Sequence, residues 1–428
     1  MLDIRDIALN PSAYKKGIAK KNVSTKGIDE AIKLYEERNK IRKEVEEMRA
    51  EQNKYSKELP KTDKDMKKKE ELIAKMSKIK EALKKAEPKE KELSVKLDQI
   101  LSTFPNPAHE SVIEGPDSSG NKVLRYVGKK PEYDFQPKPH WELGEELDLI
   151  DSERGAKVAG SRFHFLKNEL VLLQFAIIQY AFEIIMKYDF KPLLTPLLVN
   201  KMSAYGTGFL DSGHEEEVYC VNPGRDDLYL IGTSEVPNTA YYADEIIPAS
   251  ELPIRVVAFS SCFRREAGAG GKDVKGILRV HQFDKIEMGV FAHPDKSWEE
   301  HELILKIEEE IWAGLGIHFQ VVNICGGDLG GPAAKKYDLE AWMPGQNAYR
   351  EVTSTSNCTD FQARRLNIRV KDEEGTNRIL HTLNGTGVAL GRCLIAIMEQ
   401  YQTKDGEIDV PEVLKKWLPF KKIKRKAK

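Results

Sequence analysis

The chain has 428 residues, and its 67 basic and 68 acidic residues leave a net charge of −1. This length is sufficient for two domains, and 40% hydrophobic residues allow a sizeable core. A near-neutral total argues against indiscriminate nucleic-acid binding by the whole molecule. The charge is unevenly distributed, because residues 1–27, 28–98 and 421–428 carry +4, +3 and +6 and residues 99–420 therefore carry −14. Such basic appendages favour contact with a polyanion.

Two long helices are predicted over residues 28–101. Apolar residues recur every three or four positions, and the seam of the second helix consists of Leu72, Met76, Ile79, Leu83, Ala86, Glu90, Leu93, Leu97 and Ile100. Between the helices, the segment LPKTDKD contains Pro60, which ends the first helix, and Asp63, which can cap the second. We expect an antiparallel hairpin of roughly 50 Å, at 1.5 Å per residue.

The outer faces of such a hairpin are free to bind, because two helices bury only one narrow seam. Heptads more often mediate dimerisation, and the residues alone favour a dimerisation coiled coil and a binding arm about equally. Pro88 lies within the second helix, where it removes a hydrogen bond and is expected to cause a kink.

The remainder of the chain predicts an α+β fold. A long apolar helix over 165–187 is mixed with short strands over 254–260, 278–291, 317–325 and 379–387. Because helices and strands do not alternate regularly, an antiparallel sheet flanked by helices is favoured over a parallel, doubly wound one. We expect domains at 1–103 and 104–420 and a disordered basic tail at 421–428.

Residues 263–287, FRREAGAGGKDVKGILRVHQFDKIE, have the pattern of a hairpin that binds a nucleotide. Alternate side chains share one face of a strand, which groups Arg264 with Glu266, and Arg279 and His281 with Phe283 and Glu287. Guanidinium groups suit phosphate or carboxylate oxygens, and a flat phenyl ring suits a purine. The alternative is a surface hairpin with exposed salt bridges.

A second pattern, NGTGVALGR at 384–392, places three glycines before Arg392 and an apolar run. Glycines let a backbone approach a ligand closely, although the packing of a helix on a sheet would explain them equally well. The arginine at the junction would direct a fixed charge at the ligand.

Together the two patterns resemble motifs 2 and 3 of the class II aminoacyl-tRNA synthetases. Gly387, Gly391 and Arg392 match the second of these motifs. Motif 1, an apolar helix followed by a strand with a set proline, resembles residues 169–187 and Pro196. Asp189 stands where that family usually has glycine, which leaves the turn geometry there open.

A finer resemblance, to the seryl-tRNA synthetase family, covers nearly the whole chain. It is carried in order by MLDIRDIALNP at the start, TSE at 233–235, RVHQFDKIEM at 279–288, SNCTDFQARRLNIR at 356–369, TLNGTG at 382–387 and VPEVL at 410–414. The resemblance implies a class II catalytic domain with an N-terminal helical hairpin. It also implies a ligase that activates serine with ATP and transfers the seryl group to the 3′ end of tRNA-Ser, with charging of tRNA-Sec left open.

The resemblance assigns roles to individual residues. The catalytic residues would be Arg264, Arg279 and Arg392. Serine would be bound by Thr233, Ser234, Glu235, Arg264, Glu287 and Thr386. ATP would be bound by Arg264, Arg265, Glu266, Arg279, Val280, Phe283, Glu351, Val352, Thr353, Ser354 and Arg392. Glu351 and Ser354 would hold Mg²⁺, and the hairpin would grip tRNA through Lys67, Lys68, Lys69, Lys78, Lys84 and Lys85. The family usually has serine where Thr353 stands.

The remaining expectations concern compartment and partners. Five cysteines without CxxC spacing indicate a reducing, cytoplasmic compartment, and no Cys/His spacing suggests zinc. We expect no stretch to approach the ~20 apolar residues of a membrane span, and the family resemblance implies a homodimer. Two alternatives stay open: a serine-activating enzyme that serves a carrier or an amide product, and a non-catalytic tRNA-binding paralogue.

Overall fold

The computed structural model describes residues 2–62, 65–210, 215–267, 275–372 and 374–425. The chain divides into two compact units. The first comprises the residues up to Ala19 together with Val23–Pro105, and the second comprises Lys20–Asn22 and Asn106–Lys428.

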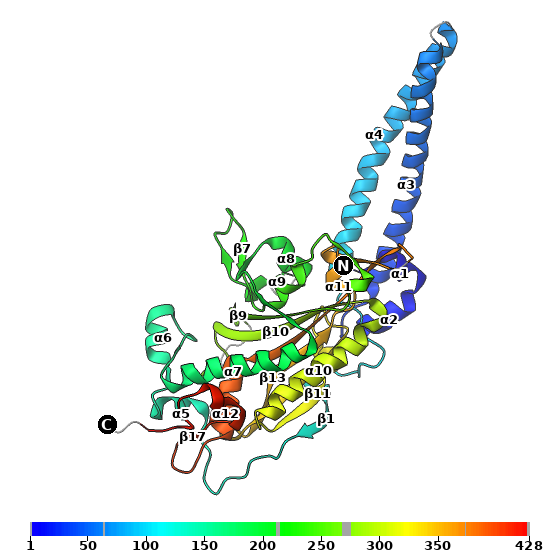
Figure 1. Ribbon diagram of the computed structural model, residues 1–428. Coiled ribbons are helices and arrows are strands. Elements are labelled where there is room, and N and C mark those ends of the chain that lie inside the picture. Colours follow the sequence, from blue (N-terminus) through cyan, green and yellow to red (C-terminus); the bar gives the residue numbers. More distant parts are fainter. Residues whose placement is uncertain (1, 63–64, 211–214, 268–274, 373, 426–428) are drawn as a thin grey trace. The chain divides into compact units, whose positions relative to one another are not determined.

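The first unit is helical and confirms the predicted hairpin. Two short helices, α1 (Ile4–Leu9) and α2 (Pro11–Ala19), precede the long α3 (Lys26–Glu58) and α4 (Met66–Ser102), which run antiparallel side by side (Figure 1). The side chain of Asp65 caps α4 by accepting a hydrogen bond from the Lys68 amide. The predicted cap, Asp63, lies outside the described residues.

The hairpin is held by a narrow apolar seam, as its spacing predicted. Ile41 and Val45 of α3 are buried against Leu83 and Leu93 of α4. Ion pairs such as Arg49–Glu87, at 2.8 Å, flank the seam, but exposed pairs of this kind contribute at most about 1 kcal/mol. Helix α4 continues through Pro88. The kink expected at Pro88 stays a prediction.

The second unit is built on an eight-stranded sheet in the order β1-β11-β12-β13-β16-β10-β9-β4. Its strands are β1 (Lys122–Val127), β4 (Lys191–Leu194), β9 (Ile254–Phe263), β10 (Gln282–Ala292), β11 (Phe319–Asn323), β12 (Lys335–Met343), β13 (Ala348–Asn357) and β16 (His381–Ala389). All neighbours are antiparallel except β4 and β9. The α+β prediction is therefore confirmed.

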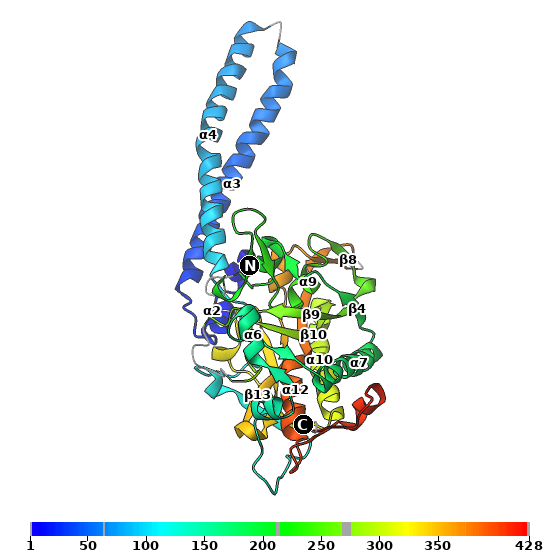
Figure 2. The same ribbon diagram turned by 90° about the vertical axis from the view of Figure 1, so that its left-hand side faces the viewer.

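One face of this sheet carries the main core. The helices α7 (Glu169–Ile185), α10 (Ser297–Gly314) and α12 (Leu390–Gln400) pack on it and on one another (Figure 2). On β10, Ile286, Met288 and Val290 belong to this core. The alternation of a strand therefore leaves Phe283, Lys285 and Glu287 on the opposite face.

Smaller elements surround the sheet. They include α5 (His140–Glu146), α6 (Ser152–Ala159), α8 (Lys201–Gly206), α9 (Glu235–Ala240), α11 (Phe361–Arg365), β2 (Ile150–Asp151), β3 (Phe165–Leu166), β5 (Leu198–Val199), β6 (Cys220–Val221), β7 (Leu228–Leu230), β8 (Ile246–Pro248), β14 (Arg369–Lys371) and β15 (Asn377–Ile379). The last pair of strands, β17 (Ile408–Asp409) and β18 (Lys422–Ile423), is antiparallel. The predicted disorder of the tail is thus wrong for residues 422–423, and residues 426–428 lie outside the described part.

Helix α7 and the turn after it bear on two expectations: that no segment is long and apolar enough to span a membrane, and that the turn geometry at Asp189 is open. By length and composition, Glu169–Tyr188 is apolar enough to span a membrane, so the expectation that no stretch approaches that length is wrong. Leu170, Leu173 and Ile177 of this helix nevertheless lie in the core of the sheet unit. Asp189 has φ 61°, the left-handed conformation that glycine adopts freely and aspartate tolerates.

Candidate active site

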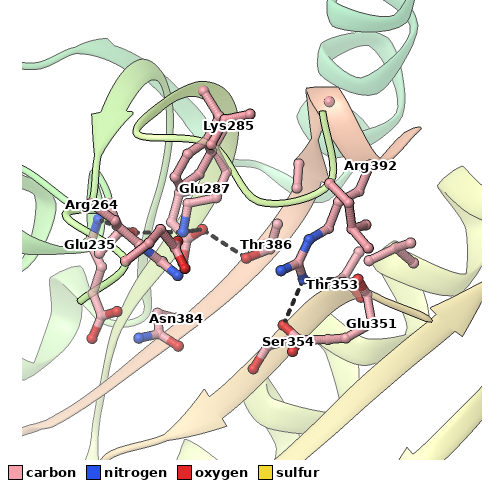
Figure 3. A pocket seen from close by; sticks show the side chains of 18 of the residues that line it. Glu235, Arg264, Lys285, Glu287, Glu351, Thr353, Ser354, Asn384, Thr386 and Arg392 are labelled. Atoms are coloured by element: carbon pink, nitrogen blue, oxygen red, sulfur yellow. Dashed lines mark hydrogen bonds and ion pairs between the residues drawn. The ribbon is translucent and has the colours of Figure 1, made fainter. Parts of the chain in front are cut away.

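A cavity of about 260 Å³ lies on the face of the sheet that carries Lys285 and Glu287. Its walls are the β10, β13 and β16 strands, the segment after β9, the starts of α9 and α12, and residues 277, 278 and 280 (Figure 3). The two sequence patterns therefore meet in one place, because β10 and β16 are neighbours and pair Glu287 with Thr386.

Most of the predicted site residues line this cavity. They are Thr233, Glu235, Arg264, Glu266, Val280, Phe283, Glu287, Glu351, Val352, Thr353, Ser354, Thr386 and Arg392. Three others are not part of the lining: Ser234, Arg265 and Arg279. Ser234 is fully buried before α9, and Arg279 lies at the margin, 3.4 Å from the carboxylate of Glu266.

Sequence reasoning missed several lining residues: Phe209, Ile277, Leu278, Lys285, Ser356, Asn384 and Ala389. Lys285 could have been found, because it stands between Phe283 and Glu287 at the same alternate spacing. Phe209 gave no such signal, because its place depends on how a distant helical segment packs.

The acidic end of the cavity is a connected group of polar side chains. Lys285 Nζ lies 2.6 Å from Glu287 Oε2 and donates to Thr233 Oγ1 at 2.7 Å. Thr386 Oγ1 donates to Glu287 Oε2 at 3.0 Å. Figure 3 shows these side chains in a row, with Glu287 of β10 between Lys285 of β10 and Thr386 of β16. This end can therefore hold a small ligand that carries both a hydrogen-bond donor and a positively charged group.

Glu235 forms the other wall of this acidic end. Its carboxylate accepts a hydrogen bond from Gln362 Nε2 at 2.7 Å, and Gln362 in turn accepts one from Thr382. Burial and the neighbouring Glu287 raise the pKa of Glu235 to about 7. An ammonium group placed beside it would favour the ionised carboxylate.

The cavity wall also combines a guanidinium with an aromatic ring. Arg264 follows β9, and its Cζ lies 5.3 Å from the centre of the Phe283 ring. Its Nε donates to the Gly232 carbonyl at 3.2 Å. The residues of the predicted Gly-rich loop at 268–274 lie outside the described part of the chain.

A bulge in β13 places two oxygen donors on the cavity side. The pairing with β12 runs from Thr353 opposite Leu339 to Glu351 opposite Glu340, so Val352 is an extra residue. Glu351 and Ser354, three positions apart, can therefore both face the cavity. Thr353 turns its hydroxyl the other way and donates to Glu308 of α10 at 2.8 Å.

Arg392 holds Glu351 in place at the end of the cavity near the β13 bulge. Its Nη1 lies 3.2 Å from a carboxylate oxygen of Glu351 and donates to the Glu351 carbonyl at 2.8 Å. Partial burial opposes ionisation of Glu351, but Arg392, Lys336 and Arg264 together hold its pKa below the ordinary value. The site thus holds an ionised carboxylate beside a fixed guanidinium.

The glycines of the second pattern serve two different purposes. A Cβ at Gly385 would lie 2.2 Å from Ile304 of α10, so this glycine is required for helix packing. A Cβ at Gly391 would meet only the Ile277 carbonyl, at 3.6 Å, which leaves that backbone accessible from the cavity.

The other predicted features can also be placed. Lys67, Lys68, Lys78, Lys84 and Lys85 are exposed on α4, and Lys69 is partly exposed. The five cysteines are all free. Within the described ranges, no group of three or more His, Cys, Asp or Glu side chains could hold a metal ion.

The antiparallel sheet and its arginine-bearing cavity define a class II aminoacyl-tRNA synthetase core, and the family model "tRNA synthetase class II core domain (G, H, P, S and T)" matches residues 218–401. The model "Seryl-tRNA synthetase N-terminal domain" matches residues 1–108. The chain belongs to the seryl-tRNA synthetase family, and its activity is that of a serine–tRNA ligase.

The similarity to individual relatives extends over the whole chain. The serine–tRNA ligase of Treponema denticola is 43% identical over 99% of this chain and 100% of the relative. The crystal structure of seryl-tRNA synthetase from Pyrococcus horikoshii complexed with ATP superposes with a TM-score of 0.94, at 41% identity and with both chains fully covered. The cytoplasmic serine–tRNA ligase from Naegleria fowleri in complex with AMP gives 0.89, at 34% identity over 100% and 99%.

Proposed function

We propose that the cavity carries out serine activation and that the helical hairpin binds tRNA-Ser. Activation joins a serine carboxylate oxygen to the α-phosphorus of ATP and expels pyrophosphate, which gives seryl-adenylate. A ribose hydroxyl of the terminal adenosine of tRNA then attacks the seryl carbonyl and AMP leaves. No covalent bond to the protein is needed, so catalysis consists of positioning and of charge stabilisation.

The observation that supports this most strongly is the grouping of charges in the cavity: the carboxylates of Glu235 and Glu287 lie with Arg264 on one side, and Arg392 lies beside Glu351 on the other (Figure 3). Serine would place its ammonium beside Glu235 and its hydroxyl between Glu287 and Thr386. Arg264 would bridge the serine carboxylate and the α-phosphate, and Phe283 with Arg392 would hold the adenine. Pyrophosphate exchange measured with each amino acid tests this, and serine alone should support it.

Arg279 and Arg392 would hold the terminal phosphates. Arg279 lies at the margin and contacts Glu266, so ATP would have to draw it from that carboxylate. Arg265 and Ser234 have no cavity-lining surface in this structure, and a role for either would require a change on ligand binding.

Glu351 and Ser354 fit a Mg²⁺ ion that accompanies ATP, because the bulge brings a carboxylate and a hydroxyl to one side and both are hard oxygen ligands. Bound there, the ion would neutralise charge on the phosphates. Arg392 would orient the Glu351 carboxylate.

Glu351→Gln is expected to weaken the Mg²⁺ dependence of ATP binding. Calorimetric titration of ATP without serine, at several Mg²⁺ concentrations, should show affinity that responds much less to Mg²⁺ than in the parent protein. The matched control is Glu340→Gln, because Glu340 stands opposite Glu351 on β12 but outside the cavity. An unchanged Mg²⁺ response in Glu351→Gln would contradict the assignment.

The lysines of α4 would meet the tRNA backbone. Lys67, Lys78 and Lys85 are separated by eleven and seven residues, so they share one face of α4, away from the seam of Leu72 and Leu83. A basic stripe of this kind suits phosphates.

Cytoplasmic localisation is proposed on the basis of the free cysteines and the family membership. The domain limits at residues 103 and 420 remain a proposal.

We expect a homodimer. Large apolar side chains are exposed on α7 and on the strand β4 that follows: Leu172 is 45%, Phe175 58% and Leu194 89% exposed. Exposed groups of this kind mark interaction surfaces, and a two-fold contact is the commonest solution. Light scattering should give twice 48.6 kDa, and Phe175→Asp combined with Leu194→Asp should lower it. A fully active monomer would refute the dimer.

A further inference from the structure

One buried cation in the cavity has no role in the mechanism proposed above. The side chain of Lys285 is 7% exposed, and its Nζ contacts Glu287 Oε2 and Thr233 Oγ1. An ammonium removed from water costs several kcal/mol unless it is paired. Its presence beside the serine end of the site therefore calls for a functional reason.

The charges at this end of the cavity supply that reason. Glu235 and Glu287 are two carboxylates in one small space, and the charge of Glu287 helps to raise the pKa of Glu235. Serine brings one ammonium, which can balance one carboxylate, and its own carboxylate is balanced by Arg264. The second carboxylate therefore needs a cation from the protein, and Lys285 is placed to provide it.

The geometry also fixes which oxygen of Glu287 is available. Lys285 and Thr386 both contact Oε2, which leaves Oε1 to accept a hydrogen bond from the substrate. An ionised carboxylate only accepts, so it requires a donor on the ligand. The serine hydroxyl meets that requirement and the methyl group of alanine does not.

We infer that Lys285 is a positioning residue for amino-acid selection: its ammonium pairs with Glu287 and holds that carboxylate in place, so that preference for serine over alanine depends on it. This inference rests on the proposal that Glu287 recognises the serine hydroxyl.

The central test is Lys285→Met, which keeps the length of the side chain and removes its charge. Pyrophosphate exchange should show a KM for serine raised about 10²-fold and a serine-to-alanine preference lowered at least about tenfold. The KM for ATP should change by less than about threefold, because Lys285 belongs to the serine end of the cavity. Lys285→Arg should recover part of the preference.

The pH profile gives a readout that a merely structural role would not move. Protonated Glu235 cannot pair with the serine ammonium, so the KM for serine should rise as the pH falls below about 7. Lys285 lowers the pKa of Glu235, and its loss should shift this rise to higher pH. The other charged or titratable groups near this end are Cys262, Cys358, Arg264, Glu287 and Glu308.

Glu287→Gln, measured in parallel, separates the two proposals. If Glu287→Gln loses the preference for serine and a folded Lys285→Met keeps it, the role of Lys285 is wrong and that of Glu287 stands. If both keep it, the assignment of Glu287 fails as well. Should Lys285→Met not fold, Lys285→Gln decides: an unchanged preference overturns the inference and a reduced one supports it.

Discussion

Removal of residues 30–98 is expected to leave serine-dependent pyrophosphate exchange within a few-fold of the parent rate and to reduce tRNA charging by at least about 10²-fold. The physical reason is the separation of the two functions along the chain. Every residue that lines the cavity belongs to the second unit, and residues 30–98 belong to the first. The core under the sheet likewise consists of residues beyond 140. Exchange and charging are measured on the same preparation, so exchange also reports on folding.

A milder variant separates loss of the hairpin from loss of its charge. Replacement of Lys67, Lys68 and Lys69 by Ala should weaken tRNA binding and reduce the slope of log affinity against log salt by ~2 to 3, provided that each lysine contacts one phosphate. The control replaces three exposed lysines of the second unit, Lys122, Lys129 and Lys371. Equal loss of salt dependence in both variants, or charging that survives removal of the hairpin, would refute the proposed division of labour.

Patterns that act within one element were predictable from the sequence. The hairpin follows from a heptad seam, and the cavity positions of Phe283 and Glu287 follow from the alternation of a strand. The alternation failed at Arg279, because β10 begins at Gln282 and the preceding residues are not in a strand. Arg279 therefore lies beside Glu266 and not in line with Phe283.

Features that depend on a distant partner were not predictable. The bulge at Val352 exists in the pairing of β13 with β12, and it decides that Ser354 faces the cavity while the hydroxyl of Thr353 reaches Glu308. Burial and the like charges of Glu287 and Asp338 raise the pKa of Glu308, although the hydrogen bond from Thr353 opposes this. The strand β18 likewise forms only because β17 is available.

Glu287→Ala is expected to abolish serine activation, by about 10⁴-fold or more, while ATP still binds. Serine differs from alanine by one hydroxyl, and a site built to bond a hydroxyl rejects the analogue that lacks it by roughly 10⁴, because buried polar groups are left unpaired. In Glu287→Ala the buried Lys285 also loses its partner at 2.6 Å. Pyrophosphate exchange with serine and alanine measures the loss, and ATP titration gives the control.

Threonine keeps the hydroxyl of serine, so hydrogen bonding to that hydroxyl cannot exclude it. The methyl group that threonine adds is worth only ~1 to 3 kcal/mol in apolar contacts, so threonine must be excluded by shape. Thr386 donates to Glu287 from the facing strand, so we expect its own methyl group to occupy space beside the substrate hydroxyl. Thr386→Ser should therefore keep serine activation near the parent rate, because the bond to Glu287 survives, and should admit more threonine. Exchange rates with serine, alanine and threonine test both variants. A Glu287→Ala enzyme that still prefers serine over alanine would show that another residue recognises the hydroxyl.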